Sequence, residues 1–585
     1  MKTARRPVID VVSLELTRNR LSAIANEMAI AVQKSAYSTN IKTRRDFSCA
    51  IFDARGRAVA QSFSQPVHLG SLSHFVPRII EHVRKQGVRP GDAWICNDGY
   101  RGGVHLNDVC VVAPVHVGKR LVAYVANLAH HLDVGGSTPG SMVGYSTEIL
   151  HEGLRIPPTR LMRDRQMDVD VIALIANNVR APRETSGDLR AQVAGLNVGE
   201  SRITELVAKL GADGLARACD EILAYTERRV RAGIRDLPAG TYRAEDYMDG
   251  DGNSDEPVKV VVTVRIGRDQ VVFDLTGSDP QRRGPINATY AMSLSCCAYA
   301  LRVLLANDIP SNDGFYRVCK VVAPAGTVVN ATFPAPIGGG WETGNRVTET
   351  AMRALAQAVP ERLAAGSKGC FSNIAFGGVS PRDDGYFMFY ETVCGGYGGR
   401  AARDGVDGVQ AHGQNTENSP IEETEVGYPV EIVRYGLIPD SEGAGRHRGG
   451  LGVRRDYRFE FPITFSVLAD RSRFAPWGLA GGGEGRPVRL VLDPDIEGRT
   501  LPSKVSVELR QGQIFSVQMA GGGGYGPAWE RDAARVAQDV KDERLSVDRA
   551  RDAYGVVLDP RTGAVDEAGT RRLRGRMRRR AAPRP

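Results

Sequence analysis

The amino-acid sequence predicts a mixed α+β protein of several domains, with an N-terminal α/β region followed by a β-rich C-terminal region. The chain has 585 residues, 42% of them hydrophobic, a length typical of roughly three or four domains. Helix and strand patterns alternate over residues 1–240, whereas strand patterns separated by Gly and Pro turns follow one another from Tyr428 to about Val517. This order argues against a parallel, doubly wound sheet.

The N-terminal region begins with a predicted helix from about Val12 to Ser35. Its apolar residues recur at spacings of seven, three and four and therefore share one face; they are Leu14, Leu21, Ile24, Met28 and Val32. Runs of β-branched and other apolar residues predict the strands that follow, at 49–54, 93–98, 108–117 and 120–131. Helices are then expected within 164–210 and 215–235.

The later elements complete a division into segments. Alternating runs predict a β-hairpin at 258–267 and 270–277, and helices are expected at 290–305, 346–358, 529–540 and 546–554. These patterns predict an N-terminal α/β region with a metal site (1–240), a central α+β region (241–427), a β-rich region (428–528), a C-terminal helical segment (529–560) and a basic, disordered tail (561–585).

The charge distribution argues against a nucleic-acid enzyme. The formal net charge is +8, but residues 571–585 hold eight arginines and no acid, and the rest of the chain has 68 basic and 68 acidic residues. A nucleic-acid enzyme should carry a basic face on its folded part. We therefore expect no specific nucleic-acid partner, and nonspecific contact of the tail with polyanions is the less favoured alternative to a solvated end.

Cysteine usage and hydropathy indicate a cytoplasmic protein. The nine cysteines include no C-x-x-C pair and no regular framework, which is typical of buried, reduced thiols. No apolar run approaches the ~18 residues of a membrane span, and residues 1–16 lack the apolar core of a signal peptide. No membrane partner is expected.

Several common catalytic motifs are absent. Gly118-Lys119 is followed by Arg120, and no glycine precedes it at the spacing of a phosphate-binding loop. The glycine clusters at 338–340, 481–483 and 521–524 do not open a strand-turn-helix unit, so we interpret them as tight turns. No G-x-S-x-G elbow is present either. This chain is therefore not expected to bind ATP through these motifs.

The strongest local pattern lies between Asn97 and Gly135. Two apolar strands flank Gly118-Lys119-Arg120, which is typical of a three-residue hairpin loop. In that register Asp108 lies opposite His130 and His105 opposite Asp133, with Cβ atoms of directly opposed residues ~4.5–5.5 Å apart. Two imidazoles and a carboxylate at the open end are a ligand set for a catalytic Zn, Mn or Fe ion. The alternative is that the histidines only form hydrogen bonds at the strand ends.

The sequence gives weaker evidence that other polar residues belong to the site. His131 should point to the opposite face from His130 and is interpreted as a core or supporting residue. His68 and His74 are expected in an exposed loop, where they contact substrate or pack. Asp46 follows two arginines and precedes an apolar strand, so it is either an ion-pair partner or a further metal ligand.

At these residues the sequence resembles the hydantoinase B/oxoprolinase family. The resemblance covers nearly the whole chain and includes RRDFSCAIFDARGRAVAQ (44–61), NDGYRGGVHLNDVCVVAPV (97–115), AHHLDVGGSTPGS (129–141), HEGLRIPP (151–158), GGGWETGNRVTE (338–349) and GAGRHRGGLGVRRDY (443–457). It implies a subunit that works with a separate hydantoinase A-like subunit, which binds ATP with Mg. In the family a divalent metal, zinc or manganese, sits at the pattern that corresponds to His105, Asp108 and His130, and Asp46 corresponds to a fourth, weaker ligand.

The resemblance implies ATP-dependent hydrolysis of a cyclic amide such as a hydantoin, 5-oxoproline or a lactam, within a hetero-oligomer. Phosphorylation of the amide oxygen by the partner would make the carbon open to attack, and a metal-activated water would complete the hydrolysis. The first alternative is a subunit of an ATP-dependent ketone carboxylase of the acetone or acetophenone type. The second is a non-catalytic scaffold subunit.

Overall fold

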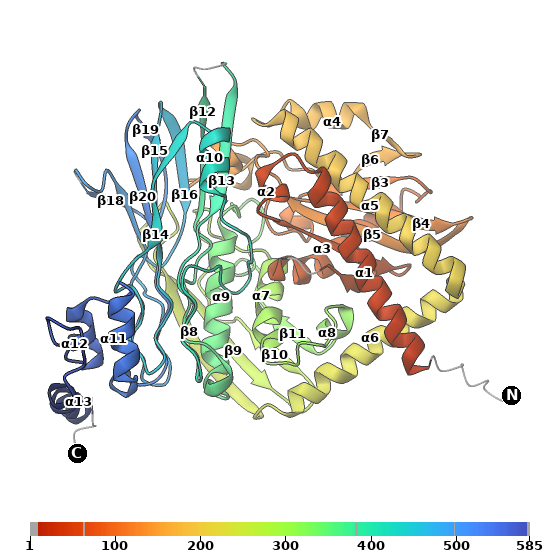
Figure 1. Cartoon of the computed structure of the whole chain (residues 1–585). Coiled ribbons are helices and arrows are strands. Elements are labelled where there is room, and N and C mark those ends of the chain that lie inside the picture. Colours follow the sequence, from red (N-terminus) through yellow and green to blue (C-terminus); the bar gives the residue numbers. More distant parts are fainter. Residues whose placement is uncertain (1–9, 63–64, 381–383, 497, 582–585) are drawn as a thin grey trace.

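The computed structural model describes residues 10–62, 65–380, 384–496 and 498–581 and confirms a mixed α+β fold (Figure 1). Within these residues the strands form four sheets, of seven, four, four and five strands. The N-terminal half contains the seven-stranded sheet and most of the long helices. The C-terminal half contains two sheets, whose strands all lie within residues 373–518.

The N-terminal sheet is antiparallel at every strand pair. Its strands in spatial order are β2 (Ala58–Gln61), β1 (Phe47–Asp53), β5 (Arg120–His130), β4 (Asp108–Val117), β3 (Ala93–Cys96), β6 (Thr159–Arg163) and β7 (Gln166–Met167). The predicted alternation of helices and strands therefore does not produce parallel βαβ units. The strands at 108–117 and 120–130 agree with the sequence prediction to within one residue.

Helices cover both faces of this sheet. Long helices α1 (Val11–Ser35) and α5 (Pro182–Leu210) pack on the face that contains Val109 and Val111, and α3 (Pro66–Arg84) packs on the face that contains Cys110 and Val112. Successive strand residues point to opposite faces, so a run that is apolar throughout is buried on both sides. The remaining helices of this half are α2 (Thr39–Lys42), α4 (Val169–Ala176) and α6 (Ala212–Arg235).

Helix α3 corrects the expectation that His68 and His74 lie in an exposed loop. The helix begins at Pro66, a residue type favoured in the first helical turn. Its buried apolar residues have helical spacing and face the sheet; they are Leu72, Phe75, Val76, Ile79 and Ile80. This apolar spacing is present in the sequence, but the first helical turns also contain two histidines and a glycine, which made the segment resemble a loop. His68 is 1% exposed.

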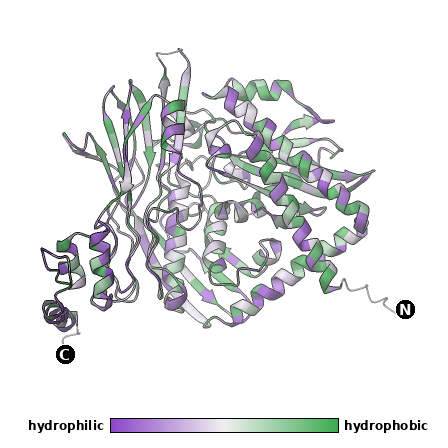
Figure 2. Ribbon diagram, in the orientation of Figure 1, coloured by the Kyte–Doolittle hydropathy of each residue, from purple (hydrophilic) through white to green (hydrophobic). Residues whose placement is uncertain are grey.

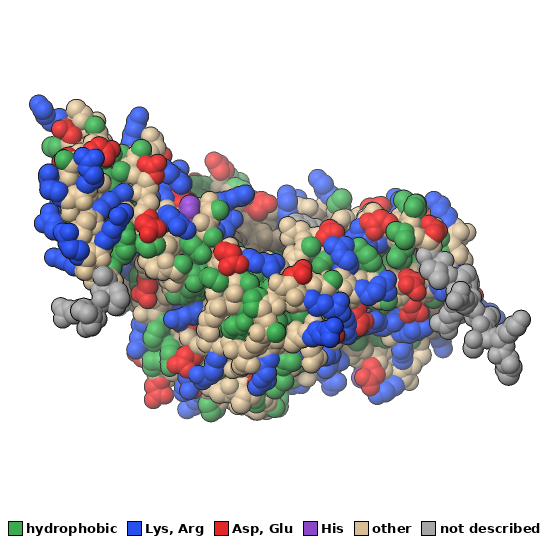
Figure 3. Space-filling model, turned by 90° about the horizontal axis from the view of Figure 1, so that it is seen from below, with side chains coloured by type: hydrophobic (Ala, Val, Ile, Leu, Met, Phe, Trp, Pro, Cys, Tyr) green, Lys and Arg blue, Asp and Glu red, His purple; other side chains and the backbone are tan. Residues whose placement is uncertain are grey.

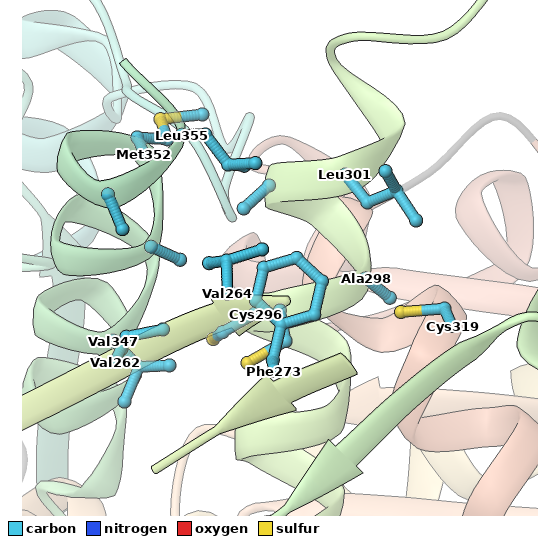
Figure 4. Close-up of a cluster of buried hydrophobic side chains, with 14 of the residues drawn as sticks. Val262, Val264, Phe273, Cys296, Ala298, Leu301, Cys319, Val347, Met352 and Leu355 are labelled. Carbon is cyan, nitrogen blue, oxygen red and sulfur yellow. The ribbon is translucent and has the colours of Figure 1, made fainter. Parts of the chain in front are cut away.

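The second sheet supports the central helices. Its order is β11 (Cys319–Val322), β10 (Val271–Asp274), β9 (Val258–Ile266) and β8 (Gly240–Met248), and β9–β10 is the predicted antiparallel hairpin. Helices α7 (Tyr290–Arg302) and α9 (Gly340–Leu355) pack against it, with the short α8 (Asp313–Tyr316) nearby. Phe273 and Val264 of the sheet lie in one apolar cluster with Cys296 of α7 and Val347 of α9 (Figure 4).

Two sheets of the C-terminal half share an aromatic core. The first contains β13 (Tyr386–Thr392), β12 (Asn373–Val379), β16 (Ile463–Leu468) and β19 (Lys504–Leu509), and the second contains β14 (Val430–Leu437), β15 (Val453–Phe459), β20 (Ile514–Gln518), β17 (Arg489–Leu492) and β18 (Arg499–Leu501). The rings of Phe465 and Phe515 stack across them with centroids 4.1 Å apart. Hydrophobic and hydrophilic residues both occur along these strands (Figure 2), as expected for sheets with one buried face. Because β12 pairs with both β13 and β16, the boundary predicted at residue 428 falls between strands of one sheet.

Glycine-rich segments between and after these strands pack against one another through backbone hydrogen bonds. Gly522 donates its backbone N–H to Gly450, Gly443 donates to Gly522, and Gly524 donates to Gly483, all over 2.7–2.9 Å. The prediction of a tight turn at 521–524 is therefore wrong, since these residues are an extended segment held between neighbouring backbones. Glycine is required here because the backbones approach too closely for a side chain.

We expect the substitution Gly522→Ala to lower the free energy of unfolding by about 3 kcal/mol or more. A Cβ atom at this position would lie 2.2 Å from the backbone oxygen of Tyr397, so the backbone would have to move. Denaturant unfolding of both proteins measures the effect. The matched control is Gly436→Ala, where a Cβ meets no atom within 4 Å. Equal stability changes for the two variants would contradict the close-packing argument.

The C-terminal segment continues as η5 (Ala528–Glu530), α11 (Ala533–Lys541), α12 (Val547–Tyr554) and α13 (Glu567–Ala581). The prediction of a disordered tail is wrong for 567–581, and residues 582–585 lie outside the described part of the chain. Helix α13 is anchored by Arg574, which donates to the backbone oxygens of Arg531 and Tyr554. Its other arginines gather at one end of the molecule (Figure 3); they are Arg571, Arg572, Arg576, Arg578, Arg579 and Arg580.

The nine cysteines are all buried and none of them forms a disulfide, which confirms their interpretation as small core residues. Burial raises the pKa of the Cys296 thiol to about 12, so this group stays protonated at neutral pH. Within the described residues, no helix combines the length and apolar character needed to cross a bilayer.

Candidate functional site

The open end of the β4–β5 hairpin forms the centre of the candidate site. Asp108 pairs with His130 as predicted, and the predicted register holds from there to Val115. The loop is shorter than predicted, because a bulge between Val115 and His116 shifts the register and Arg120 pairs with Val117. Gly118 has a φ of 59°, which is the backbone angle for which the sequence pattern requires glycine.

His105 reaches this end of the hairpin through a turn. The backbone N–H of Asp108 donates to the backbone oxygen of His105, and His105 Nε2 lies 3.5 Å from Asp108 Oδ1. The predicted pairing of His105 with Asp133 is wrong, because the paired strands end at Asp108 and His130. Asp133 instead accepts hydrogen bonds from the backbone of Gly135 and from Arg180.

Asp46 lies next to His130 because the strand that follows Asp46 pairs with the strand that ends at His130. Asp46 precedes β1, which pairs with β5, and its backbone oxygen accepts a hydrogen bond from the His130 N–H over 3.0 Å. The rings of His130 and His105 have centroids 4.9 Å apart. The four predicted residues, Asp46, His105, Asp108 and His130, therefore lie together in the structure.

A fifth residue, His68, completes the cluster from helix α3. Its Nε2 lies 3.7 Å from Asp108 Oδ1 and 4.0 Å from Asp46 Oδ1. Its Nδ1 lies 3.2 Å from the Ser48 hydroxyl. Sequence reasoning treated His68 as a loop residue, and the apolar stripe of α3 was the signal that could have placed it. His74 lies on the same helix but contacts the ring of Tyr290, with centroids 5.0 Å apart.

Supporting side chains orient the two central imidazoles. Tyr390 stacks on His130 with ring centroids 4.6 Å apart, and Trp341 meets His105 edge-on at 5.1 Å. The amide nitrogen of Asn40 lies 3.2 Å from His130 Nδ1. His131 points to the other face of the sheet as predicted, with its Nε2 3.0 Å from Gln192 Oε1. Trp341 and Tyr390 are distant in sequence and were not predicted for the site.

Burial and mutual proximity shift the ionisation of these groups. Burial raises the pKa of Asp46, against the influence of His68 and Arg44. Burial also acts to raise the pKa of Asp108, but the imidazoles of His105 and His68 outweigh it and the pKa is lowered. The pKa of His130 is lowered well below its usual value by burial and by His105. Asp108 is therefore a carboxylate and His130 a neutral imidazole at neutral pH.

The cluster contains polar atoms that have no partner within the described residues. Both ring nitrogens of His105, both carboxylate oxygens of Asp108 and Nε2 of His130 are buried without a hydrogen bond. An unsatisfied buried polar group costs about 1–3 kcal/mol, so such groups usually bind water or an ion. A cavity of about 10 Å³, lined by Asp46, His68 and His130, lies beside them. A space of this size holds roughly one water-sized species.

The residues are not arranged as a closed coordination sphere. In the described part of the chain, no group of three or more His, Cys, Asp or Glu side chains is placed so that it could hold a metal ion together. The metal site thus stays a prediction, motivated by the unsatisfied atoms and the chemistry of the donor set.

Comparison with known proteins identifies the family. The hydantoinase B/oxoprolinase family model matches residues 10–528. The chain belongs to this family. It is 38% identical over 572 residues to an uncharacterized protein of Methanocaldococcus jannaschii, covering 97% of this chain and 100% of the relative. It is 34% identical over 584 residues to a protein described as a D-/L-hydantoinase subunit from a Pseudomonas species, covering 97% and 98%.

Solved structures extend the likeness to this family. The crystal structure of the ATP-dependent caprolactamase from Pseudomonas jessenii superposes with a TM-score of 0.89 at 30% identity, covering 97% of this chain and 100% of the other. The nucleotide-free acetone carboxylase structure also has a TM-score of 0.89, at 21% identity, covering 99% and 84%. The second likeness concerns the fold alone. The family model ends before the helices α11 to α13, which therefore lie outside the family match.

Proposed function

We propose that this chain is the metal-holding subunit of an ATP-dependent enzyme that opens cyclic amides, acting with a hydantoinase A-like subunit that binds ATP and Mg. The observation that carries the proposal is the buried cluster of Asp46, His68, His105, Asp108 and His130, with unsatisfied nitrogen and oxygen atoms at its centre. The similarity to hydantoinase and caprolactamase subunits supports the reaction class.

The donor set suits zinc or manganese. Imidazole nitrogens and carboxylate oxygens bind Zn at about 2.0–2.2 Å, so two ligands of one tetrahedral ion lie about 3.4 Å apart. The separation of Asp108 Oδ1 from His105 Nε2, 3.5 Å, is close to that distance. His105, Asp108 and His130 would hold the ion, with Asp46 as a further ligand. A divalent ion there supplies Lewis-acid chemistry and lowers the pKa of water.

Amide side chains line the small cavity, and they would contact a cyclic amide once the cavity widened beyond the one water-sized species that it now holds. Gln65 Nε2 and Asn373 Nδ2 are buried donors without a partner, and Gln414 Oε1 is a buried acceptor without a partner among the described residues. The Gln65 orientation follows from its Oε1, which accepts the backbone N–H of Asn415 over 2.9 Å. A lactam or hydantoin offers both a C=O for the two donors and an N–H for the acceptor, whereas a ketone lacks the N–H.

An ATP-consumption screen with the co-purified partner subunit tests this proposal. Hydantoin, 5-oxoproline, caprolactam and acetone are supplied separately, each with and without bicarbonate. We expect ATP hydrolysis that depends on a cyclic amide and on both subunits, with the ring-opened acid as product and no effect of bicarbonate. A requirement for a ketone and stoichiometric bicarbonate would replace the proposal by a carboxylase function. Failure of all substrates, with a metal-free protein, would favour a scaffold subunit.

A further inference from the structure

A second, larger cavity lies between helices α1, α7 and α8, outside the histidine cluster. Its volume is about 780 Å³, within the range of about 300–1,000 Å³ common for small-molecule sites. The walls are mainly apolar, with side chains from α7 along one side and Ser22 of α1 on the other. The cavity contains four charged or phenolic groups besides Arg302; they are Arg18, Asp308, Tyr299 and Tyr316.

Arg302, the last residue of α7, is the lining cation that forms no ion pair among the described residues, although the charge of Asp308 acts on it from the same cavity. Its Nη2 donates to the backbone oxygens of Asn307 and Ile309, while its buried Nη1 has no hydrogen-bond partner in the same part of the chain. The other charges are already paired, since Arg18 binds Glu15 and Asp308 accepts two hydrogen bonds from Arg229, at 2.9 and 3.0 Å. A guanidinium that is partly desolvated and unpaired favours an anion.

The larger cavity shares a wall with the histidine cavity. Pro66 and Asn415 line the larger cavity, and the residues that flank them in sequence line the histidine cavity; these are Gln65, Val67, Gln414 and Thr416. The Asn415 N–H donates to Gln65 Oε1 over 2.9 Å, and the Val67 N–H donates to the Gly413 oxygen over 3.1 Å. The two cavities are therefore separated by a layer one residue thick.

Helix α7 connects this wall to Arg302. Ser295 of α7 lines the larger cavity and donates its hydroxyl to the backbone oxygen of Val67 in the wall. Seven residues of an α-helix rise about 10 Å, which is the length of a small organic molecule. Ala298 and Tyr299 lie between Ser295 and Arg302 along the same wall. A molecule with an apolar body and one charged end matches this spacing.

We propose that this cavity binds a small organic anion, with its oxyanion on Arg302 and its apolar body along α7 toward the wall of the histidine cavity. The oxyanion is a carboxylate or a phosphate monoester, since both accept hydrogen bonds from guanidinium. The inference rests on the proposed function in one respect: it assigns the cavity to the substrate or its phosphorylated form before that molecule reaches the cluster.

Calorimetric titration of the full-length chain tests this site without ATP or partner. The probes are pentanoate, butyl phosphate and the neutral pentanamide, which have similar chains but different head groups. We expect one anion to bind per chain, with Arg302→Gln weakening its binding at least 10-fold and Arg302→Lys weakening it less. Arg235→Gln, which removes an exposed arginine paired with Asp269, serves as the control and should bind as the parent does. Tighter binding of butyl phosphate would indicate the phosphorylated form, and tighter binding of pentanoate a carboxylate substrate.

Arg302 also donates hydrogen bonds to the backbone of residues 307–309, so Arg302→Gln could weaken binding by disturbing that segment. A second variant separates this structural effect from a direct contact with the anion. Ser22→Trp fills the cavity from α1 and leaves the Arg302 hydrogen bonds in place, and it should abolish anion binding. Undiminished anion binding by both Arg302→Gln and Ser22→Trp, or equal affinity for pentanamide, would overturn the site. Because titration uses neither ATP nor the metal cluster, anion binding that survives a negative activity screen would keep this site and reject the proposed function.

Discussion

Replacing His105 by alanine is expected to remove bound divalent metal and to lower the rate of ATP-dependent ring opening about a thousandfold, equivalent to about 4 kcal/mol of transition-state stabilisation. His105 is fully buried and holds two ring nitrogens that no other described side chain satisfies. Loss of this imidazole removes one of the proposed ligands and weakens the binding of the ion. Metal content by mass spectrometry and steady-state kinetics of the two-subunit complex measure both effects.

The control for this experiment is His82→Ala, which removes a histidine near the far end of helix α3 from the cluster. This variant should keep both metal and activity. Asp108→Asn adds a second test, because it preserves side-chain shape but removes the charge that His105 and His68 stabilise. Equal, negligible metal in the parent protein and in all three variants would contradict the metal site and favour the scaffold alternative.

Replacing Arg346 by methionine is expected to lower the free energy of unfolding by about 3–5 kcal/mol. Arg346 lies on α9, has no exposed surface, and donates to Asp246 over 3.0 Å and to Asp470 over 2.8 Å. Its removal leaves two buried carboxylates with less compensation, although Arg471 and Lys504 remain nearby. Urea denaturation followed by circular dichroism, on the parent and the variant, gives the difference in unfolding free energy.

Arg353→Met is the matched control for this prediction. Arg353 is on the same helix but exposed, and its hydrogen bond to the backbone oxygen of Glu245 is 3.4 Å long. Exposed charges of this kind contribute about 1 kcal/mol or less. If both variants lose the same small amount of stability, the buried ion-pair network is not a major source of stability between the central and C-terminal regions.

Much of the candidate site was predictable because its central part is local in sequence. The apolar runs at 108–117 and 120–130 determine which residues pair, and Gly118 marks the turn between them. Asp108 and His130 meet as a consequence. The bulge at Val115 was not predictable, because it depends on how the turn fits the twist of the sheet rather than on residue types.

Other parts of the site depend on contacts between segments far apart in the sequence. His68 comes from a helix that packs on the opposite side of the sheet from α1, while Trp341 and Tyr390 arrive from the central and later segments. The segment at 521–524 looked like a turn, because glycine enrichment does not distinguish a turn from a backbone pressed against other backbones.

Local patterns in the chain were sufficient to predict the α+β class, most helices and strands, and the hairpin that joins Asp108 to His130, and the family followed from the order of the motifs. Three features required the folded molecule: His68 joins the cluster, residues 567–581 form a helix, and a wall one residue thick separates two cavities. A local pattern can place His68 on a helix, but which distant segments then meet is decided by packing in the folded chain.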